Sequence, residues 1–388
     1  MKEFFKKPIF PIITASVSLV LAIGIMVAAG VSFVKCWDVP MPIEGPNVTE
    51  VKMLSEWYDG LKDGPGDTPV YVLKGEGDGG AMLILGGTHG NEPSGYMSAV
   101  TFIETAIIEN GTVYVIPYTN ISSMTHNDPG EGNLQYFTLQ TKSGERIFRF
   151  GSRATNPIHQ WPDPDVYTHH PSGQQLSGSE TRNINRAYPG REDGTLTEQI
   201  AFGIAELIRT EDVGITFDLH EASPEYPVIN ATVAHQDAMT IASEGCINLL
   251  LSGIDMALEQ SPTNFHGLTH RELGDYTDTM AILMETANAS QGRLRGGTSE
   301  EQVLGGVDDY YLYSESIGML FVPWDENHHP IEERCGRHLQ GIYEYTMAYN
   351  NAYPDKIVTY SGVPSYQELF LDADKEDLGG TQLGKFLR

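Results

Sequence analysis

Residues 81–95 read AMLILGGTHGNEPSG, and this stretch decides the fold class that the sequence predicts. Its apolar run, residues 81–85, is typical of a buried strand, and the glycines that follow end that strand. His89 and Glu92 come next, on a turn beyond the carboxyl end of the strand, where open α/β sheets place their ligand sites. Because imidazole and carboxylate groups suit a zinc ion, His89 and Glu92 are candidate metal ligands.

Strand and helix patterns alternate on both sides of this stretch. Strands are expected at residues 69–75, 112–118, 213–220 and 279–286, and helices at 98–108, 197–210 and 337–353. Such an alternation predicts an α/β fold, in which helices cover both faces of a mixed or mainly parallel sheet.

The chain divides into four expected segments. After residues 1–35, residues 36–68 contain four prolines and are expected to form a linker that ends in a short helix and turn. The main domain is expected over 69–352, with a long insertion at 121–190 and a C-terminal extension at 353–388. The insertion is rich in Gly, Pro, Ser, Asn and His, yet its aromatic residues favour an ordered functional loop over a disordered one.

The N-terminal segment contains an uncharged run of 27 residues between Lys7 and Lys35. A membrane span needs about 20 apolar residues, so residues 1–35 are expected to be an uncleaved anchor. A cleaved signal peptide and a buried helix of the main fold are the alternatives. Because the lysines of residues 1–7 precede the run, the positive-inside rule predicts that the rest of the chain lies outside the cytoplasm, either anchored or, after cleavage, secreted.

Charge and cysteine content narrow the class of protein further. The chain has 388 residues and a formal net charge of −28, and residues 1–40 are slightly basic, so residues 41–388 carry −30. Phosphate binding needs a basic face, and a nucleic-acid partner is therefore not expected. Three cysteines are too few for a disulfide framework or a cysteine zinc site. A single Cys246–Cys335 bridge stays open, as does the oligomeric state.

A second motif, FDLHEA at residues 217–222, ends another apolar strand. Asp218 and His220 lie two apart, so on a strand they share a face. His220 would then be a third metal ligand, with Asp218 or Glu221 as its support, and the alternative is a solvated strand end. A catalytic zinc site uses three protein ligands and leaves the fourth position to water, which matches this set.

Two further motifs carry candidate catalytic and binding groups. Glu285 in METAN, residues 284–288, closes an apolar strand, and an apolar setting raises the pKa of a carboxyl group toward that of a general base. The motif SETRNINRAYPG, residues 179–190, gathers two arginines and two asparagines. Such a group suits a substrate carboxylate or a developing oxyanion, although a solvated loop would also contain it.

Four features follow one another along the chain: H-x-x-E after a buried strand, N-R-x-Y-P-G, D-L-H, and a strand ending in Glu. This ordered set resembles the zinc carboxypeptidase superfamily. Over residues 69–350 the chain looks most similar to the succinylglutamate desuccinylase/aspartoacylase branch. The resemblance implies a three-layer α/β/α fold with a mixed sheet and one zinc ion per chain. The residues that it implies are the zinc ligands His89, Glu92 and His220, the carboxylate-binding pair Asn185 and Arg186, and the acid/base Glu285.

The sequence departs from the family pattern at two points. The aspartate that the family has two residues before its Asn-Arg pair is Asn183 in this chain. The long insertion leaves two candidates for the arginine that stabilises the oxyanion, Arg182 and Arg153.

The function that the resemblance implies is zinc-dependent hydrolysis of an amide bond in a small carboxylate-bearing substrate, by a deacylase. A metallocarboxypeptidase acting on peptides or cell-wall peptides is the alternative that an extracytoplasmic location favours. The remaining alternative is a membrane-anchored zinc- or ligand-binding protein without catalysis.

Overall fold

The computed structural model describes residues 9–128, 132–325 and 327–388 of the chain. The chain forms two compact units, Met1–Val39 and Pro40–Arg388.

The first unit contains helix α1 (Ile9–Lys35), whose 27 residues are long and apolar enough to cross a membrane. A signal sequence near the N-terminus can pass the same test of length and apolar composition, so the helix is a candidate for either role. The lysines on which the expected orientation rests, Lys2, Lys6 and Lys7, lie outside the described residues.

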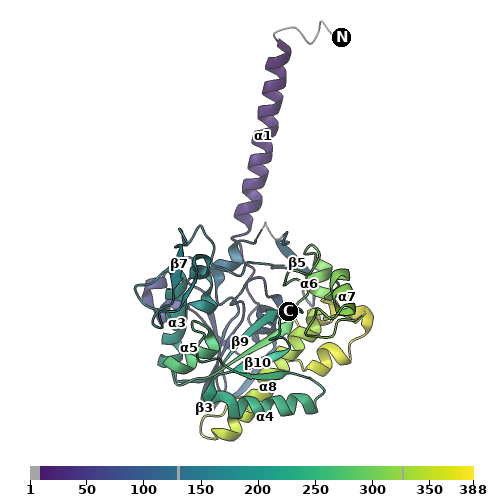
Figure 1. The fold of residues 1–388 in the computed structure, drawn as a ribbon. Helices are drawn as coiled ribbons and strands as arrows, with labels where there is room; N and C mark the ends of the chain where they lie inside the picture. The colour runs from purple at the N-terminus through teal and green to yellow at the C-terminus, as the bar shows by residue number, and fades with distance from the viewer. Residues whose placement is uncertain (1–8, 129–131, 326) are drawn as a thin grey trace. The chain divides into compact units, whose positions relative to one another are not determined.

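Within the described residues, the second unit contains one mixed sheet of nine strands, in the order β1-β2-β4-β3-β9-β12-β10-β11, with β13 paired to β4. Strands β3, β9 and β10 of this sheet are labelled in Figure 1. The strands are β1 (Val48–Met53), β2 (Pro69–Lys74), β3 (Gly77–Leu85), β4 (Ile107–Ile116), β9 (Val213–Ala222), β10 (Ala231–Ala234), β11 (Ala257–Gln260), β12 (Met280–Ala287) and β13 (Thr359–Ser361). The four neighbours β4, β3, β9 and β12 are parallel, whereas β2 and β13 run antiparallel to β4, and β10 runs antiparallel to β12. The predicted mixed sheet is confirmed.

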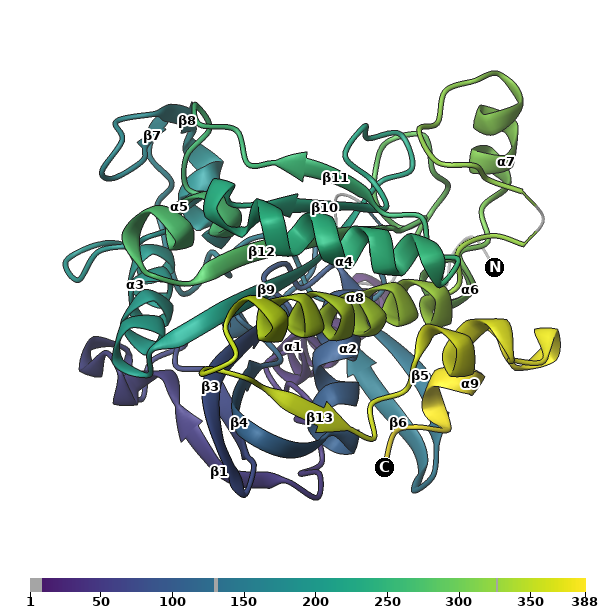
Figure 2. The same cartoon turned by 90° about the horizontal axis from the view of Figure 1, so that it is seen from below.

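Helices pack on both faces of this sheet. The helices of the unit are α2 (Pro93–Thr105), α3 (Leu196–Thr210), α4 (Met239–Leu251), α5 (Thr269–Tyr276), α6 (Glu300–Gly305), α7 (Asp309–Ser316), α8 (Ile331–Ala352) and α9 (Thr381–Gly384). Helix α8 packs against α2 and α4 on one face, and Figure 2 shows α4 and α8 side by side. Helices α3 and α5 contribute to a core on the other face, so the unit has the helix–sheet–helix layering that the alternation predicts.

Alternation along β3 explains why this strand lies at the centre of the fold. Leu83 and Leu85 are fully buried in the core that α3 completes. Met82, one residue before Leu83, faces the opposite layer, where its sulfur accepts a hydrogen bond from Thr346 of α8 at 3.3 Å. Both faces of β3 are therefore covered, as its unbroken apolar run predicts.

Residues 36–68 end in two short 3-10 helices, Leu54–Glu56 and Asp59–Leu61, which agree with the expected short helix and turn, but the segment also contributes a strand and core residues that a linker would not. Val48–Met53 forms the edge strand β1, antiparallel to β2, and Leu54 and Leu61 after it are buried in the core beside α3. All six side chains of β1 are exposed or half-buried. The strand therefore lacks the alternation of apolar and polar residues by which a half-buried strand is recognised in a sequence.

One helix boundary also differs from the prediction. The helix expected at 98–108 is α2, which begins earlier and ends at Thr105, and Ile107 already belongs to β4. Periodicity does not separate the two elements, because the apolar residues of the helix end and of the strand start form one run.

The insertion and the C-terminal extension are built into the fold. The insertion holds two hairpins, β5 (Tyr136–Thr141) with β6 (Gly144–Arg149) and β7 (Val166–Thr168) with β8 (Gln175–Ser177). In the C-terminal extension, β13 joins the sheet and α9 packs against β5. Cys246 and Cys335 are both free thiols, so the structure does not form the bridge that the sequence left open.

Candidate metal centre and active site

Three neighbouring parallel strands end at the same edge of the sheet and bring the candidate residues together. Strand β3 leads into the turn with His89 and Glu92, whereas His220 and Glu285 each lie two residues before the ends of β9 and β12. Glu285 is paired in register with His220 on the adjacent strand. Gly95 lets the first turn of α2 lie directly on β9, because a Cβ at this position would overlap the carbonyl oxygen of Leu219.

The three predicted metal ligands form one buried group. The carboxylate of Glu92 lies between the two imidazoles, with Oε1 2.7 Å from His89 Nδ1 and Oε2 2.8 Å from His220 Nδ1. All three side chains are at most 2% exposed. Their ligand atoms lie within 4.8 Å of one another, so this group could hold a metal ion.

The outer nitrogen of each imidazole is held by an oxygen acceptor. His89 Nε2 donates to Asn183 Oδ1 at 2.9 Å, and His220 Nε2 donates to Asp218 Oδ2 at 2.7 Å. The amide of Asn183 is oriented for this role, since its Nδ2 donates to Glu180 at 2.8 Å. The side-chain oxygen of Asn183 therefore accepts from His89 Nε2, as the carboxylate of an aspartate could. The asparagine at this position, where the resemblance expects an aspartate, thus still provides a hydrogen-bond acceptor for His89.

This arrangement tests whether a cation fits the group. With Nε2 of each ring used as a donor, the Nδ1 atoms are the remaining coordinating atoms, and both face the same carboxylate. A divalent cation shared by His89, Glu92 and His220 would satisfy all three groups, and outer-shell oxygens of this kind orient metal-binding histidines in proteins. The donor set of two imidazoles and one carboxylate fits zinc.

Electrostatics distinguish Glu92 from Glu285, although both are buried. Burial alone would raise the pKa of Glu92, but the two neighbouring imidazoles hold that pKa well below its ordinary value. Burial raises the pKa of Glu285 to about 8, with His220 opposing the rise and Glu92 adding to it. Oε2 of Glu285 is buried without a hydrogen-bond partner among the described residues, which leaves it available to an incoming proton.

These residues border one cavity of about 310 Å³. Besides the three metal-ligand candidates and Glu285, the cavity wall contains Arg153, Asn185 and Arg186. The Arg186 guanidinium stacks on the ring of Phe265 at 4.9 Å from the ring centre, and the Oδ1 atom of Asn185 accepts from the main chain of Thr269 at 3.0 Å. Two cationic side chains thus face the cavity beside the metal-ligand group.

The structure separates the two arginine candidates that the sequence left open. Arg153 lines the cavity, and its Nη1 lies 3.6 Å from Glu92 Oε1. Arg182 does not line the cavity, because it donates to both carboxylate oxygens of Asp163 at 2.7 and 2.9 Å and to the carbonyl of Thr155 at 3.0 Å.

Several residues of this cavity carry no signal in the sequence. Phe265 and Tyr226 lie in irregular segments without a motif, and Gln291 and Gly292 follow the METAN motif at a distance that no pattern predicts. Their positions depend on the packing of loops, so only the folded chain identifies them.

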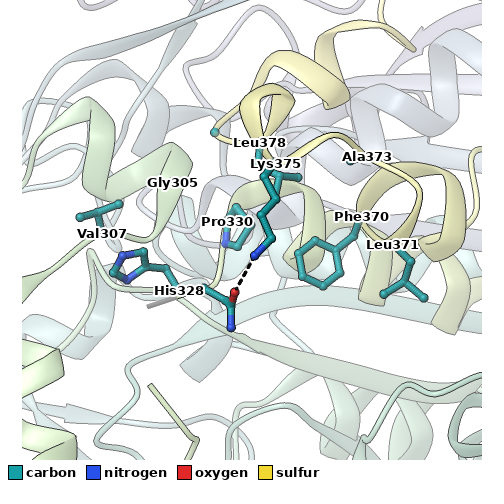
Figure 3. A pocket seen from close by; sticks show the side chains of 11 residues that line it. Gly305, Val307, His328, Pro330, Phe370, Leu371, Ala373, Lys375 and Leu378 are labelled. Carbon is teal, nitrogen blue, oxygen red and sulfur yellow. Dashed lines mark hydrogen bonds between the residues drawn. The ribbon is translucent and has the colours of Figure 1, made fainter. Parts of the chain in front are cut away.

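A larger cavity lies elsewhere in the second unit. It has a volume of about 560 Å³, and apolar side chains such as Val307, Phe370 and Leu371 form much of its wall, beside His328 and Lys375 (Figure 3). It contains none of the metal-ligand candidates, so its size does not make it the candidate active site.

No family model matches the chain, and no curated protein matches it. Among solved structures, the chain is similar to a succinylglutamate desuccinylase/aspartoacylase from Rhodobacter sphaeroides, with 15% identity, 59% of this chain and 54% of the other covered, and a TM-score of 0.35. It is also similar to a metallo-carboxypeptidase from Burkholderia cenocepacia, with 8% identity, 77% of this chain and 68% of the other covered, and a TM-score of 0.43. The cell shape determinant protein Csd4 from Helicobacter pylori matches with 13% identity, 76% of this chain and 56% of the other covered, and a TM-score of 0.41.

The chain spans about half the length of the desuccinylase/aspartoacylase structures that it matches.

Proposed function

We propose that the protein is a zinc-dependent hydrolase that cleaves an amide bond in a small substrate carrying a carboxylate. The observation that supports this proposal most is the meeting of three kinds of group in one cavity: a buried His-Glu-His group, an unpartnered glutamate oxygen and two arginines. These are the parts that metal-assisted amide hydrolysis needs, namely a metal site, a proton acceptor and donors for developing negative charge.

His89, Glu92 and His220 would hold the zinc ion, which when bound activates a water molecule and polarises the carbonyl of the substrate. Glu285 accepts a proton from the attacking water at Oε2 and later delivers it to the leaving amine. The pKa of about 8 suits a group that must both take and return a proton near neutral pH.

The two arginines have different roles in this proposal. Arg153 lies beside the metal-ligand group and donates hydrogen bonds to the oxyanion that forms from the carbonyl. Arg186, backed by Phe265, and the amide of Asn185 bind the carboxylate of the substrate.

Arg153→Met tests the first of these roles. Loss of one donor to an oxyanion typically lowers kcat by about 10² to 10³-fold, and we expect a decrease of this size with zinc content unchanged. The matched control is Arg182→Met, which removes an ion pair to Asp163 outside the cavity and should lower the melting temperature but not kcat. A larger loss of kcat in Arg182→Met than in Arg153→Met would reverse the assignment.

Substrate size is the point on which the deacylase and carboxypeptidase alternatives differ. A cavity of about 310 Å³ is at the small end of ligand sites, which favours an N-acyl amino acid over a long peptide. Zinc analysis of the purified protein, followed by a panel of N-acyl amino acids and C-terminal peptides, tests the proposal. Each compound is paired with its carboxamide analogue, which should be hydrolysed poorly because it lacks the charge that Arg186 binds. A protein without zinc, or one inactive on the whole panel, would refute the proposed function.

We also propose that α1 anchors the protein in a membrane with the second unit outside the cytoplasm. The length and composition of α1 support this, and secretion after cleavage is the alternative. Protease treatment of intact producing cells should degrade the second unit, and N-terminal sequencing of the mature protein separates the anchored form from the cleaved one. Protection of the second unit until the cells are lysed would contradict the orientation.

A further inference from the structure

We propose that Glu221 and Arg334 are positioning residues that hold the metal-ligand group and one wall of the cavity in place from behind. This inference rests on the metal centre of the proposed function. Glu221 belongs to the cavity wall although its side chain is fully buried, whereas Arg334 does not line the cavity, and neither side chain takes part in substrate binding or proton transfer in this proposal.

Glu221 links four parts of the chain that meet at the site. Its main-chain N–H donates to Glu92 Oε2 at 3.1 Å, so it holds the central ligand directly. Its carboxylate accepts from the N–H of Ser94, in the first turn of α2, at 3.1 Å and from Nδ2 of Asn288 at 2.9 Å. The same carboxylate pairs with Nη1 of Arg334.

Arg334 connects this point to a more distant part of the fold. Its Nε donates to the carbonyl of His329 at 3.0 Å, and its Nη2 donates to the carbonyl of Val303. The Arg334 and Glu221 side chains are only 1% and 0% exposed. The guanidinium therefore ties the carboxylate of Glu221 to the N-terminal turn of α8 and to α6.

The segment after β12 is held by the same connections. Asn288 donates its amide to Glu221, and its Oδ1 accepts from the N–H of Ser290 at 2.7 Å. Gln291 then reaches back to the carbonyl of Asn91, in the ligand turn, at 2.6 Å. Glu221 thus couples the turn that carries His89 and Glu92 to the wall that carries Gln291 and Gly292.

A buried ion pair is weak support for stability, because the cost of removing two charges from water offsets much of their attraction. Directional hydrogen bonds from one carboxylate to several segments, in contrast, restrict geometry, and outer-shell partners of this kind tune metal affinity. The observations therefore favour a role in positioning over a role in stability alone.

Zinc affinity of the metal-free protein distinguishes the two roles without relying on turnover. Glu221→Gln keeps the volume of the side chain but loses the charge that pairs with Arg334. We expect it to bind Zn²⁺ about 10 to 100-fold more weakly, as measured by competition with a chromophoric chelator. The absorption spectrum of the Co²⁺-loaded variant should also differ from that of the wild type, because the ligand geometry changes.

The control is Glu333→Gln in α8, the helix that carries Arg334. Glu333 is also buried and also pairs with an arginine, since Arg337 Nε donates to its Oε1 at 2.9 Å. Its other side-chain partner is His329 at 2.7 Å, and neither partner belongs to the metal-ligand group. This variant should lose thermal stability and keep the zinc affinity and Co²⁺ spectrum of the wild type. An equal loss of zinc affinity in Glu333→Gln would overturn the inference, because the effect would then follow from destabilisation.

Arg334→Lys is the second variant and serves if Glu221→Gln does not fold. Lysine keeps the positive charge but lacks the fork that reaches two carbonyls and a carboxylate together, so zinc affinity should again decrease. If both Glu221→Gln and Arg334→Lys bound zinc as tightly as the wild type, the positioning role would be overturned and the proposed function would still stand. Failure of the wild type itself to bind zinc would instead refute the proposed function on which the inference rests.

Discussion

Glu285→Gln should retain zinc and lose turnover. Glutamine has nearly the same shape as glutamate, and Glu285 contributes no atom to the His-Glu-His group, so the metal site should stay intact. The amide cannot accept the proton of the attacking water, and loss of a general acid–base group typically lowers the rate by about 10² to 10⁴-fold. Single-turnover kinetics with an N-acyl amino acid and zinc analysis of the same sample measure both quantities.

The matched control is Glu259→Gln, an exposed glutamate on strand β11 of the same sheet. It should keep both zinc and turnover. If Glu285→Gln were as active as the wild type, Glu285 would not be the proton-transfer group. If it lost zinc, its part in the site would be structural.

Stability offers an independent check on the environment of Glu285. In the metal-free protein the pKa of this carboxyl is raised from 4.5 to about 8 by burial. A raised folded-state pKa means that the stability it contributes is fully present below about pH 4.5 and is lost as the pH rises toward 8. The melting temperature of the metal-free wild type should therefore fall relative to that of Glu285→Gln over this range.

His220→Ala should abolish zinc binding and, with it, turnover. The substitution removes one of three ligands and leaves Asp218 buried without the imidazole that donates to it. Zinc bound to the folded state alone stabilises the wild type, by about 2.7 kcal/mol when its concentration is 100 times the dissociation constant. Chelation should therefore lower the melting temperature of the wild type, whereas the variant should respond neither to chelator nor to added zinc.

His170→Ala provides the comparison, because His170 is exposed and lies outside the metal-ligand group. It should bind zinc as the wild type does and show the same rise in melting temperature. Zinc binding that survives in His220→Ala would show that the metal, if present, is held by other residues.

Much of the fold and of the candidate site could be predicted from local patterns. The apolar runs before His89, before His220 and before Glu285 predict three buried strands. In the structure His89 follows its strand, and His220 and Glu285 each lie two residues before the ends of theirs. The layered arrangement with a mixed sheet follows from the same alternation. The edge strand β1 could not be predicted, because few of its side chains are buried and a pattern of burial is what periodicity detects.

The choice among arginines lay beyond any local pattern. Arg153 and Arg182 both stand in the loop-rich insertion, and only the packing of that insertion shows that Arg182 is bound by Asp163 while Arg153 borders the cavity. The same holds for Phe265 behind Arg186, and for Arg334 behind Glu221, which are separated from their partners by 79 and 113 positions of sequence.

The sequence by itself determined which residue types stand at the ends of three strands, and therefore the chemistry that this edge of the sheet can support. Only the tertiary structure decided that β3, β9 and β12 are neighbours, which side chains surround their ends and which arginine faces the cavity. The physical reason is that hydrophobic periodicity shows which face of a segment is buried but not which other segment covers that face. Contacts between distant segments depend instead on how loops close and side chains pack, and these leave no periodic trace.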